Sequence, residues 1–566
     1  MRLDYGKLGQ EALERLRNTS ENAVSIQKSL LVELIHDNRN TVYGRKYGFY
    51  KIEDVWEYQK RVPVSVYEDY EDYILQMIGG KDSVLTAKPA VYFCISSGTM
   101  GRPKYLPLTE ADLDIQYLYA YGLVFGIAGE YYRDLPETEV FGKIFQIGEF
   151  AKTYMEDGRM NGIRSGALYQ WLDRDGQFDA SDYCVPKEVL FPDTLEDLLY
   201  VKVRFALAER GLCAIHGVFI NRVSKVMDYI QRNWELLLRD MRQGSVDESV
   251  NLSGRWREYV MQKLPPDLSR AQELGTIPNE KLCQGMIGKI WPNVRYVLAI
   301  GGKAFPYYTD KLKEYAGAIP IYHYAYAASE GIFGVARKSD EADAYILFPE
   351  AGFFEFYPLT GKKKDNGQPC FLWELCKGER YELLFTNHSG LYRYCMGDVI
   401  EVIDWFGQAP VVKFCYRKNQ VISIAGEKSN QEQLEEAVNQ FSCRTGIKVT
   451  GYCVQEDVSD VLPRYLFYME GSGKRDVDAK RILDECLCCV NYEYRGCRKM
   501  NEIGEPRIAY LREGSFERYE EHLAAEGHLM GQNKRICILG TAEKKAFFAS
   551  EKEGGGNEKE NDRDYR

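Results

Sequence analysis

The segment that most constrains this chain is residues 94–104, which read Cys-Ile-Ser-Ser-Gly-Thr-Met-Gly-Arg-Pro-Lys. The segment directly follows the apolar, β-prone run 90–93, so it predicts a strand that ends in a loop. A polyphosphate needs hydrogen-bond donors packed closely around it, and glycines let backbone N–H groups approach. The loop supplies two glycines, three hydroxyls and a cation: Gly98, Gly101, Ser96, Ser97, Thr99 and Lys104. The sequence therefore predicts a loop that can hold ATP phosphates.

The order of these residues differs from that of a P-loop. A P-loop places Gly-Lys-Ser/Thr at the end of a longer spacer, whereas here the hydroxyls come first. A turn rich in serine and glycine is also typical of ordinary loops. The segment alone therefore leaves two alternatives open, a phosphate-binding loop and a plain turn.

Length, charge and hydropathy bound the class of protein. A chain of 566 residues is long enough for two or more domains, and 45% hydrophobic residues are typical of a globular protein. The net charge of −11 argues against a general nucleic-acid or anionic-membrane binder, whose surface would be basic. The charged N-terminus is unlike a secretory signal, and no apolar run reaches roughly 20 residues. We expect a cytoplasmic protein without membrane or nucleic-acid partners, as a monomer or weak homodimer.

The fifteen cysteines are scattered, and they form no paired Cys-x-x-Cys motif with zinc spacing. Buried free thiols in a reducing compartment are the favoured interpretation. A metal cluster at Cys486, Cys488 and Cys489 is the alternative.

The fold class predicted from the pattern is α/β for a large N-terminal domain over 1–418, because short β-prone runs alternate with helical stretches. Strands are expected at 91–95, 294–300, 353–357, 381–386 and 399–403, with helices around 196–210, 219–240 and 309–316 and amphipathic helices in the first 35 residues. A smaller α+β domain is expected over 419–545. Residues 546–566 are expected to be a disordered tail, because the last residues are rich in Gly, Glu, Lys and Asn.

A second cluster, residues 322–331, places an aromatic ring, a hydroxyl and a carboxylate close together in Tyr326, Ser329 and Glu330. The ring can stack on adenine, the hydroxyl can reach a phosphate oxygen, and the carboxylate can bind Mg²⁺ that bridges phosphates. The alternative interpretation is a buried tyrosine-rich strand, with Ser329 capping the start of a helix.

Further candidates lie in the C-terminal third. Asp398 follows a glycine and can accept both hydroxyls of a ribose, although such an Asp is commonly a local backbone acceptor at a turn. Arg417 begins a polar segment near the expected domain boundary. Lys534 supplies a cation in the sequence Gly-Gln-Asn-Lys-Arg, although such a pair is usually a solvated surface feature.

Taken in order, these blocks resemble the adenylate-forming superfamily, and within it the GH3 family of acyl acid–amido synthetases. The resemblance covers about residues 90–540. The blocks that carry it are 96–99 with Pro103 and Lys104, 326–330, 353–356, 390–394, 397–399, 514–516 and 531–534.

The resemblance implies a large adenylate-forming domain, a smaller mobile C-terminal domain, and the cofactors ATP and Mg²⁺. It implies that a carboxylic acid is adenylated, with release of pyrophosphate, and that the acyl group passes to an amine such as an amino acid. The implied roles are phosphate binding by Ser96, Ser97, Gly98 and Thr99, adenine contact by Tyr326, α-phosphate contact by Ser329, Mg²⁺ binding by Glu330, ribose binding by Asp398, nucleotide binding at the pivot by Arg417, and charge neutralisation during adenylation by Lys534.

Two departures from the family pattern bear on the substrates. The residue before Ser329 is Ala328, where the family usually has a small hydroxyl residue. Residues 424–427 include Gly426, which is similar to the glycine beside the pantetheine tunnel of coenzyme A ligases. Two alternatives therefore stay open: an acyl- or aryl-coenzyme A ligase with the same first step, and a nucleotide-binding protein without chemistry.

Overall fold

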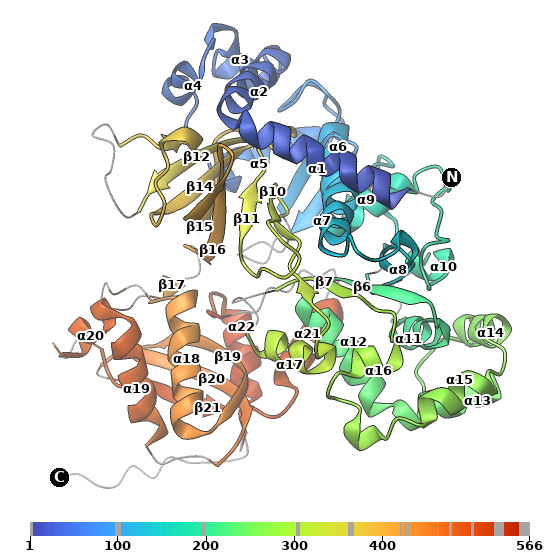
Figure 1. The fold of residues 1–566 in the computed structure, drawn as a ribbon. Coiled ribbons are helices and arrows are strands. Elements are labelled where there is room, and N and C mark those ends of the chain that lie inside the picture. Colours follow the sequence, from blue (N-terminus) through green and yellow to red (C-terminus); the bar gives the residue numbers. More distant parts are fainter. Residues whose placement is uncertain are drawn as a thin grey trace, which may run out of the picture. The chain divides into compact units, whose positions relative to one another are not determined.

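The computed structural model of this chain consists of two compact units, drawn in Figure 1. The residues that the structure describes are 4–96, 104–148, 150–193, 198–301, 306–359, 367–418, 421, 422, 424, 427, 429–460, 462–474, 478–499, 503–525 and 537–553. Among them, the N-terminal unit comprises those in 4–96, 104–396 and 400–414. The C-terminal unit comprises those in 397–399 and 415–553.

The amphipathic helices expected near the N-terminus are α1 (Tyr5–Glu21) and α2 (Ala23–Asp37). α1 packs against α7 (Val124–Tyr131), and the two helices meet at Gly9 and Gly126. A Cβ atom on Gly9 would lie 2.7 Å from Gly126, so a larger residue would push the helices apart.

One sheet of the N-terminal unit has four strands, and all of them are parallel. Its strands in spatial order are β3 (Lys143–Gln146), β6 (Leu212–Phe219), β7 (Tyr296–Ile300) and β8 (Ile321–Tyr322). The connections include α12 (Ile220–Arg232) and α17 (Pro306–Ala316). Parallel strands joined by helices are the α/β arrangement that the sequence predicts.

A second sheet, of eight strands, carries several candidate site residues. Its order is β13-β12-β14-β15-β16-β11-β10-β9, and Figure 1 shows β12, β14, β15 and β16 side by side. The strands are β9 (Ala325–Ala328), β10 (Gly331–Ala336), β11 (Tyr345–Leu347), β12 (Phe353–Pro358), β13 (Cys370–Phe371), β14 (Arg380–Thr386), β15 (Tyr394–Phe406) and β16 (Ala409–Arg417). The strands expected at 353–357, 381–386 and 399–403 are confirmed.

A third sheet carries the start of the predicted phosphate loop. Its order is β2-β1-β5-β4. The strands are β1 (Tyr92–Ser96), β2 (Lys104–Leu108), β4 (Thr153–Tyr154) and β5 (Met160–Gly162).

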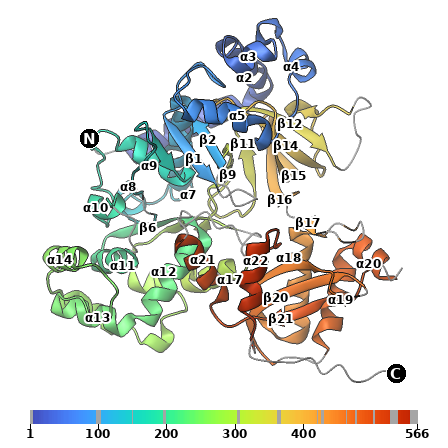
Figure 2. The same cartoon turned by 180° about the vertical axis from the view of Figure 1, so that it is seen from behind.

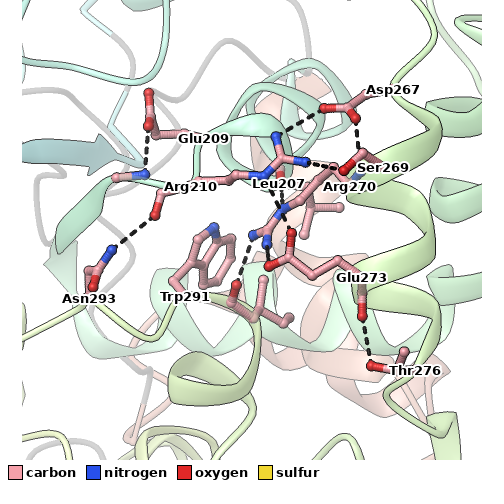
Figure 3. Close-up of polar contacts among 12 residues, drawn as sticks. Leu207, Glu209, Arg210, Asp267, Ser269, Arg270, Glu273, Thr276, Trp291 and Asn293 are labelled. Carbon is pink, nitrogen blue, oxygen red and sulfur yellow. Dashed lines mark hydrogen bonds and ion pairs between the residues drawn. The ribbon is translucent and has the colours of Figure 1, made fainter.

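A buried arginine ties together three helices of the N-terminal unit (Figure 3). The side chain of Arg270 is 1% exposed. Its Nε donates to the Leu207 carbonyl at 2.9 Å and its Nη2 to the Ile290 carbonyl at 2.8 Å. Carbonyls in the last turn of a helix lack partners inside it, so the guanidinium satisfies two of these acceptors. The helices are α11 (Leu199–Ala208), α15 (Leu268–Gly275) and α16 (Met286–Ile290).

The C-terminal unit is built on a three-stranded sheet in the order β19-β20-β21 (Figure 1), and Figure 2 shows β20 and β21 from behind. Alternate residues of its strands belong to two separate apolar clusters: Val454 and Phe467 pack with α18 and α19, whereas Cys453 and Tyr468 pack with α21 and α22. Because successive side chains of a strand point to opposite faces, helices cover both faces of this sheet. The elements are β19 (Lys448–Asp457), β20 (Arg464–Ser472), β21 (Arg507–Tyr510), α18 (Gln431–Thr445), α19 (Ala479–Val490), α21 (Ser515–Ala525) and α22 (Ala542–Ser550).

The expectation that residues 546–566 form a disordered tail is wrong for 546–553. These residues complete α22 and continue beyond it, and Phe548 is fully buried. The Glu551 carboxylate accepts a hydrogen bond from Arg512 Nη2 at 2.8 Å and from Arg518 Nε at 3.0 Å. Composition cannot reveal partners that lie elsewhere in the chain, and these partners order the segment.

Among the described residues, no helix combines the length and the apolar character that crossing a bilayer requires.

Candidate active site

The predicted phosphate loop leaves the sheet at the end of β1. Ser96 is the last residue of that strand, and Lys104, the first residue of β2, lies opposite Ser96 in an antiparallel pair. The Lys104 ammonium lies 3.6 Å from the Glu68 carboxylate and 4.6 Å from the centre of the Tyr67 ring. The strand is therefore confirmed, and Lys104 is held at the base of the loop by an ion pair and a ring. The loop residues Ser97, Gly98 and Thr99 lie outside the described residues.

The second cluster forms a hairpin. Gly331 of β10 pairs with Ala328 of β9, so Ser329 and Glu330 form the turn between two antiparallel strands. The helix start that one interpretation placed at Ser329 is wrong, because the chain continues as a strand after the turn. The Glu330 carboxylate is thereby presented at the end of a paired hairpin.

Tyr326 lies in β9 and is only 7% exposed. Its ring centre lies 5.1 Å from that of Phe333, 5.8 Å from that of Phe414 and 6.1 Å from that of Tyr345. The structure therefore places Tyr326 in an aromatic cluster of the N-terminal unit, which is the surrounding expected of a buried tyrosine-rich strand. Its contact with adenine stays a prediction.

Glu330 is also largely buried, with 9% of its surface exposed. The Tyr394 hydroxyl donates to Glu330 Oε1 at 3.3 Å, and the Asn387 side-chain amide donates to the Glu330 backbone carbonyl at 3.0 Å. Mg²⁺ in nucleotide sites is typically held by one or two carboxylates, with water and phosphate oxygens as its other ligands. A single oriented carboxylate such as Glu330 fits that donor set.

The cysteines of the alternative metal cluster differ from Glu330 in this respect. Across the described segments, no group of three or more His, Cys, Asp or Glu side chains is placed to hold a metal ion. Those segments include Cys486, Cys488 and Cys489, and no disulfide joins any of the fifteen cysteines, all of which are described.

Asp398 and Arg417 meet within the C-terminal unit. Arg417 Nε donates to Asp398 Oδ1 at 2.5 Å, and the Lys418 backbone N–H donates to the Gly397 carbonyl at 2.7 Å. The Asp398 side chain is 2% exposed and that of Arg417 is 22% exposed. Gly397 has a φ of +81°, a value that favours glycine, and this conformation directly precedes the carboxylate. The predicted ribose acceptor is thus in contact with the predicted pivot.

Lys534, the candidate for charge neutralisation, lies outside the described residues, as do Asn419 and Gly426. The structure adds residues that sequence reasoning missed. Asp112 and Arg164 form a buried pair, and Arg164 Nη1 lies 3.5 Å from the Ser329 carbonyl. No short motif could have revealed this pair, because its members come from different helices.

Comparison with protein families gives three ordered matches along the chain. The N-terminal domain of the GH3 family matches residues 12–321, its central domain matches residues 345–417, and its C-terminal domain matches residues 432–543.

Curated relatives align over nearly the whole chain. The jasmonoyl–L-amino acid synthetase JAR4 of Nicotiana attenuata is 27% identical over 557 residues, with 94% of each chain covered. The probable indole-3-acetic acid-amido synthetase GH3.11 of Oryza sativa subsp. japonica is 28% identical over 566 residues, again with 94% of each chain covered.

Solved structures show the same fold. The GH3.15 acyl acid amido synthetase in complex with 2,4-DB superposes with a TM-score of 0.83 at 22% identity, covering 98% of this chain and 97% of that chain. A 2-hydroxyisobutyryl-CoA ligase in complex with 2-HIB-AMP superposes with a TM-score of 0.51 at 12% identity, covering 96% and 91%. The predicted fold class, with a large N-terminal part and a smaller C-terminal part, is confirmed.

Proposed function

Because this chain belongs to the GH3 family, we propose that it is an ATP-dependent acyl acid–amido synthetase, a ligase that forms an amide between a carboxylic acid and an amino acid. The observation that carries the proposal is the ordered match of all three family domains along the chain. Two relatives that align with 94% of the chain are named as a jasmonoyl–L-amino acid synthetase and a probable indole-3-acetic acid-amido synthetase, which supports the same activity.

The chemistry explains why ATP is needed. A carboxylate resists attack by an amine because it is anionic and its oxide is a poor leaving group. Attack of the carboxylate oxygen on the α-phosphorus of ATP breaks the bond to the β-phosphate, so an acyl-adenylate forms and pyrophosphate leaves. The amine nitrogen then attacks the acyl carbon, a proton is lost, and AMP leaves with the electron pair of the broken bond.

The chain's own residues divide this work. In the proposal, Ser96, Ser97 and Thr99 hold the phosphates that leave, and Ser329 contacts the α-phosphate. Glu330 holds Mg²⁺, which when bound neutralises phosphate charge. Asp398 accepts the ribose hydroxyls.

Lys534 is proposed to neutralise charge that develops at the α-phosphate, since a lysine ammonium acts as a point charge there. Lys534→Ala should then lower the rate of adenylation by about 100-fold and raise the dissociation constant for ATP much less. Pyrophosphate release and calorimetric ATP binding measure the two effects. Equal losses in both would contradict a role confined to the transition state.

We further propose a cytoplasmic monomer or weak homodimer that acts on small molecules and not on nucleic acid or membranes. The net charge of −11 supports the proposed absence of nucleic-acid and membrane partners, because anionic polymers and lipid surfaces attract basic proteins. Sedimentation over a range of protein concentrations would test the oligomeric state.

The decisive test is a matrix of carboxylic acids against amino acids and coenzyme A, with pyrophosphate release and product mass as readouts. Pyrophosphate release that depends on the acid, followed by an amide product, is the expected result. A thioester product with coenzyme A would favour the ligase alternative, and ATP binding without any pyrophosphate release would favour a nucleotide-binding protein. The control omits the amine, so that adenylation is measured without transfer.

A further inference from the structure

The turn that carries Ser329 and Glu330 is held by its two backbone carbonyls. Arg164 Nη1 approaches the Ser329 carbonyl at 3.5 Å, and Asn387 Nδ2 donates to the Glu330 carbonyl at 3.0 Å. Both contacts are with the backbone of the turn, so they help to fix its position. The position of the turn then sets where the Ser329 hydroxyl and the Glu330 carboxylate lie.

One buried carboxylate links the two contacts. Asp112, in α6 (Glu110–Tyr117), accepts a hydrogen bond from Arg164 Nη2 at 3.0 Å through its Oδ1. Its Oδ2 accepts a hydrogen bond from the Ser389 hydroxyl. The Ser389 backbone N–H in turn donates to Asn387 Oδ1 at 2.9 Å. The chain of contacts therefore runs from one carbonyl of the turn to the other.

The residues of this network come from different parts of the N-terminal unit. Arg164 is the first residue of α9 (Arg164–Leu172), Ile163 alone separates it from β5, and β5 pairs with β1. Asn387 and Ser389 lie in the connection between β14 and β15, and Ser389 also accepts from the Thr109 backbone N–H at 2.9 Å. Movement of any one element would therefore be transmitted to the turn.

The burial of the Arg164–Asp112 ion pair indicates a role beyond stabilising the fold. The side chain of Arg164 is 8% exposed and that of Asp112 is 3% exposed. Taking both charges out of water costs several kcal/mol per ion, and a well-packed apolar pair of similar volume is often as stable or more stable. An apolar pair could not, however, bond the Ser329 carbonyl. The feature gained is a directed contact to the turn.

We propose that Arg164, oriented by Asp112, is a positioning residue that places Ser329 and Glu330 for adenylation. This inference rests on the proposed function, in which those two side chains face the α-phosphate and Mg²⁺. A displacement of about 1 Å at a reacting group can cost on the order of 100-fold in rate, so loss of this contact is expected to be visible in the adenylation step.

The chain offers a matched control in Arg270. Arg270 is also buried in the N-terminal unit, and it also donates to two backbone carbonyls, those of Leu207 and Ile290 (Figure 3). Its hydrogen bonds and ion pair with Leu207, Ile290 and Glu273 involve none of the proposed site residues. Replacing either arginine removes a buried guanidinium, but only Arg164 touches the turn.

The first experiment compares Arg164→Met, Arg164→Lys, Asp112→Asn and Arg270→Met in the full chain. We expect Arg164→Met to lower pyrophosphate release about 30- to 100-fold per folded molecule. We expect it also to raise the Mg²⁺ concentration for half-maximal rate severalfold, whereas Arg270→Met changes neither by more than about twofold. Formation of the Mg²⁺–ATP complex in solution is common to all variants, so a difference between them reports on the protein.

The conservative variants keep the test informative if Arg164→Met does not fold. Arg164→Lys retains one donor and should recover part of the lost activity, and Asp112→Asn should shift the Mg²⁺ midpoint in the same direction as Arg164→Met. Unchanged Mg²⁺ midpoints in both Arg164→Lys and Asp112→Asn would overturn the proposal. An equal loss of pyrophosphate release in Arg270→Met and Arg164→Met would also overturn it.

A double-variant cycle tests whether Arg164 acts through the turn. In a background that combines Ser329→Ala with Glu330→Gln as one change, Arg164→Met should cost no more than about threefold further, because both residues that it positions are already disabled. Fully additive losses would show that Arg164 acts elsewhere and would overturn the proposal.

The same variants separate this inference from the proposed function. If the wild-type chain released no pyrophosphate with any acid, the proposed function would fail. The Mg²⁺ dependence of ATP binding, measured by calorimetry without an acid, would then decide the positioning role. A shifted midpoint in Arg164→Met but not in Arg270→Met supports the role, and equal midpoints overturn it.

Discussion

Two arginine–carboxylate ion pairs each have one member in the short segment 392–398, and they differ in how far their side chains are buried. In the first pair, Arg393 Nε donates to both oxygens of Glu355, at 3.2 and 3.0 Å. Arg393 Nη1 also donates to the carbonyls of Gln59 at 2.9 Å and Val62 at 2.6 Å. The two charged side chains are 3% and 1% exposed, so this pair joins the N-terminal segment to the eight-stranded sheet.

The second pair, Arg417 with Asp398, belongs to the C-terminal unit and is more open. A hydrogen bond from Arg417 Nε to Asp398 Oδ1 joins the two side chains, and 22% of the arginine side chain is exposed. A guanidinium that reaches solvent can move when a ligand approaches, whereas one enclosed by a carboxylate and two carbonyls cannot. Under the proposed function, two residues of one short motif therefore have different roles: Arg393 stabilises the fold, and Asp398 is proposed to bind the ligand.

The largest expected effect is on activity, from Asp398→Ala. Two charge-assisted hydrogen bonds to the ribose would be lost, at about 1.5–3 kcal/mol each, so pyrophosphate release should fall at least about 100-fold. The protein should remain folded, because the partner left behind, Arg417, can turn to solvent. Pyrophosphate release and a thermal melt check the two statements.

Near wild-type activity in Asp398→Ala would show that the ribose assignment is wrong. A large fall in the melting temperature would instead show that Asp398 stabilises the fold as the Arg393–Glu355 pair does. The contrast between the two pairs would then disappear. Asp404→Ala is the matched control, because Asp404 is an aspartate of the same strand, β15, and its ion pairs with Arg337 and Lys377 are partly exposed.

The next largest effect is on stability, from Arg393→Met. This change leaves the Glu355 carboxylate buried without its partner, which should lower the free energy of unfolding by about 3–5 kcal/mol. Urea unfolding followed by fluorescence measures the loss. Pyrophosphate release per folded molecule should change little.

A double variant sharpens the same point. Arg393→Met combined with Glu355→Leu removes both buried charges, and an apolar pair of similar volume is often neutral or stabilising. Most of the stability lost in Arg393→Met should therefore return. If the double variant stays as unstable as the single variant, the hydrogen bonds to the Gln59 and Val62 carbonyls matter more than the charge balance.

Local patterns predicted much of this fold. The strand expected at 91–95 is β1, and that expected at 381–386 is β14, because β-prone runs bounded by turn residues are read from neighbouring positions. The helix expected over 219–240 is two helices, α12 and α13 (Trp234–Gln243), which meet at Asn233. An amphipathic pattern can continue through such a break, so periodicity alone did not reveal it.

The candidate site shows the same limit more clearly. Ser329, Glu330 and Asp398 could be found because each lies in a short motif. The contact of Arg164 with Asp112 joins two helices that are far apart in sequence, and no spacing rule connects them. The sequence identified side chains that are proposed to face a ligand, whereas the groups that contact the backbone around those side chains depend on how the chain folds back on itself.

The smallest expected effect comes from the open pair itself. Arg417→Gln removes the charge of an arginine side chain that is 22% exposed, while the glutamine amide can still donate to Asp398, so the KM for ATP should rise by no more than about fivefold and kcat should stay nearly constant. Thermal stability should change little for the same reason. Steady-state pyrophosphate release at varied ATP measures both constants. A loss of activity as large as that of Asp398→Ala would mean that the Asp398 carboxylate functions only while Arg417 holds it in place. Both ion pairs would then be fixed parts of the structure. The exposed fraction of the arginine side chain would in that case not indicate which pair a ligand can rearrange.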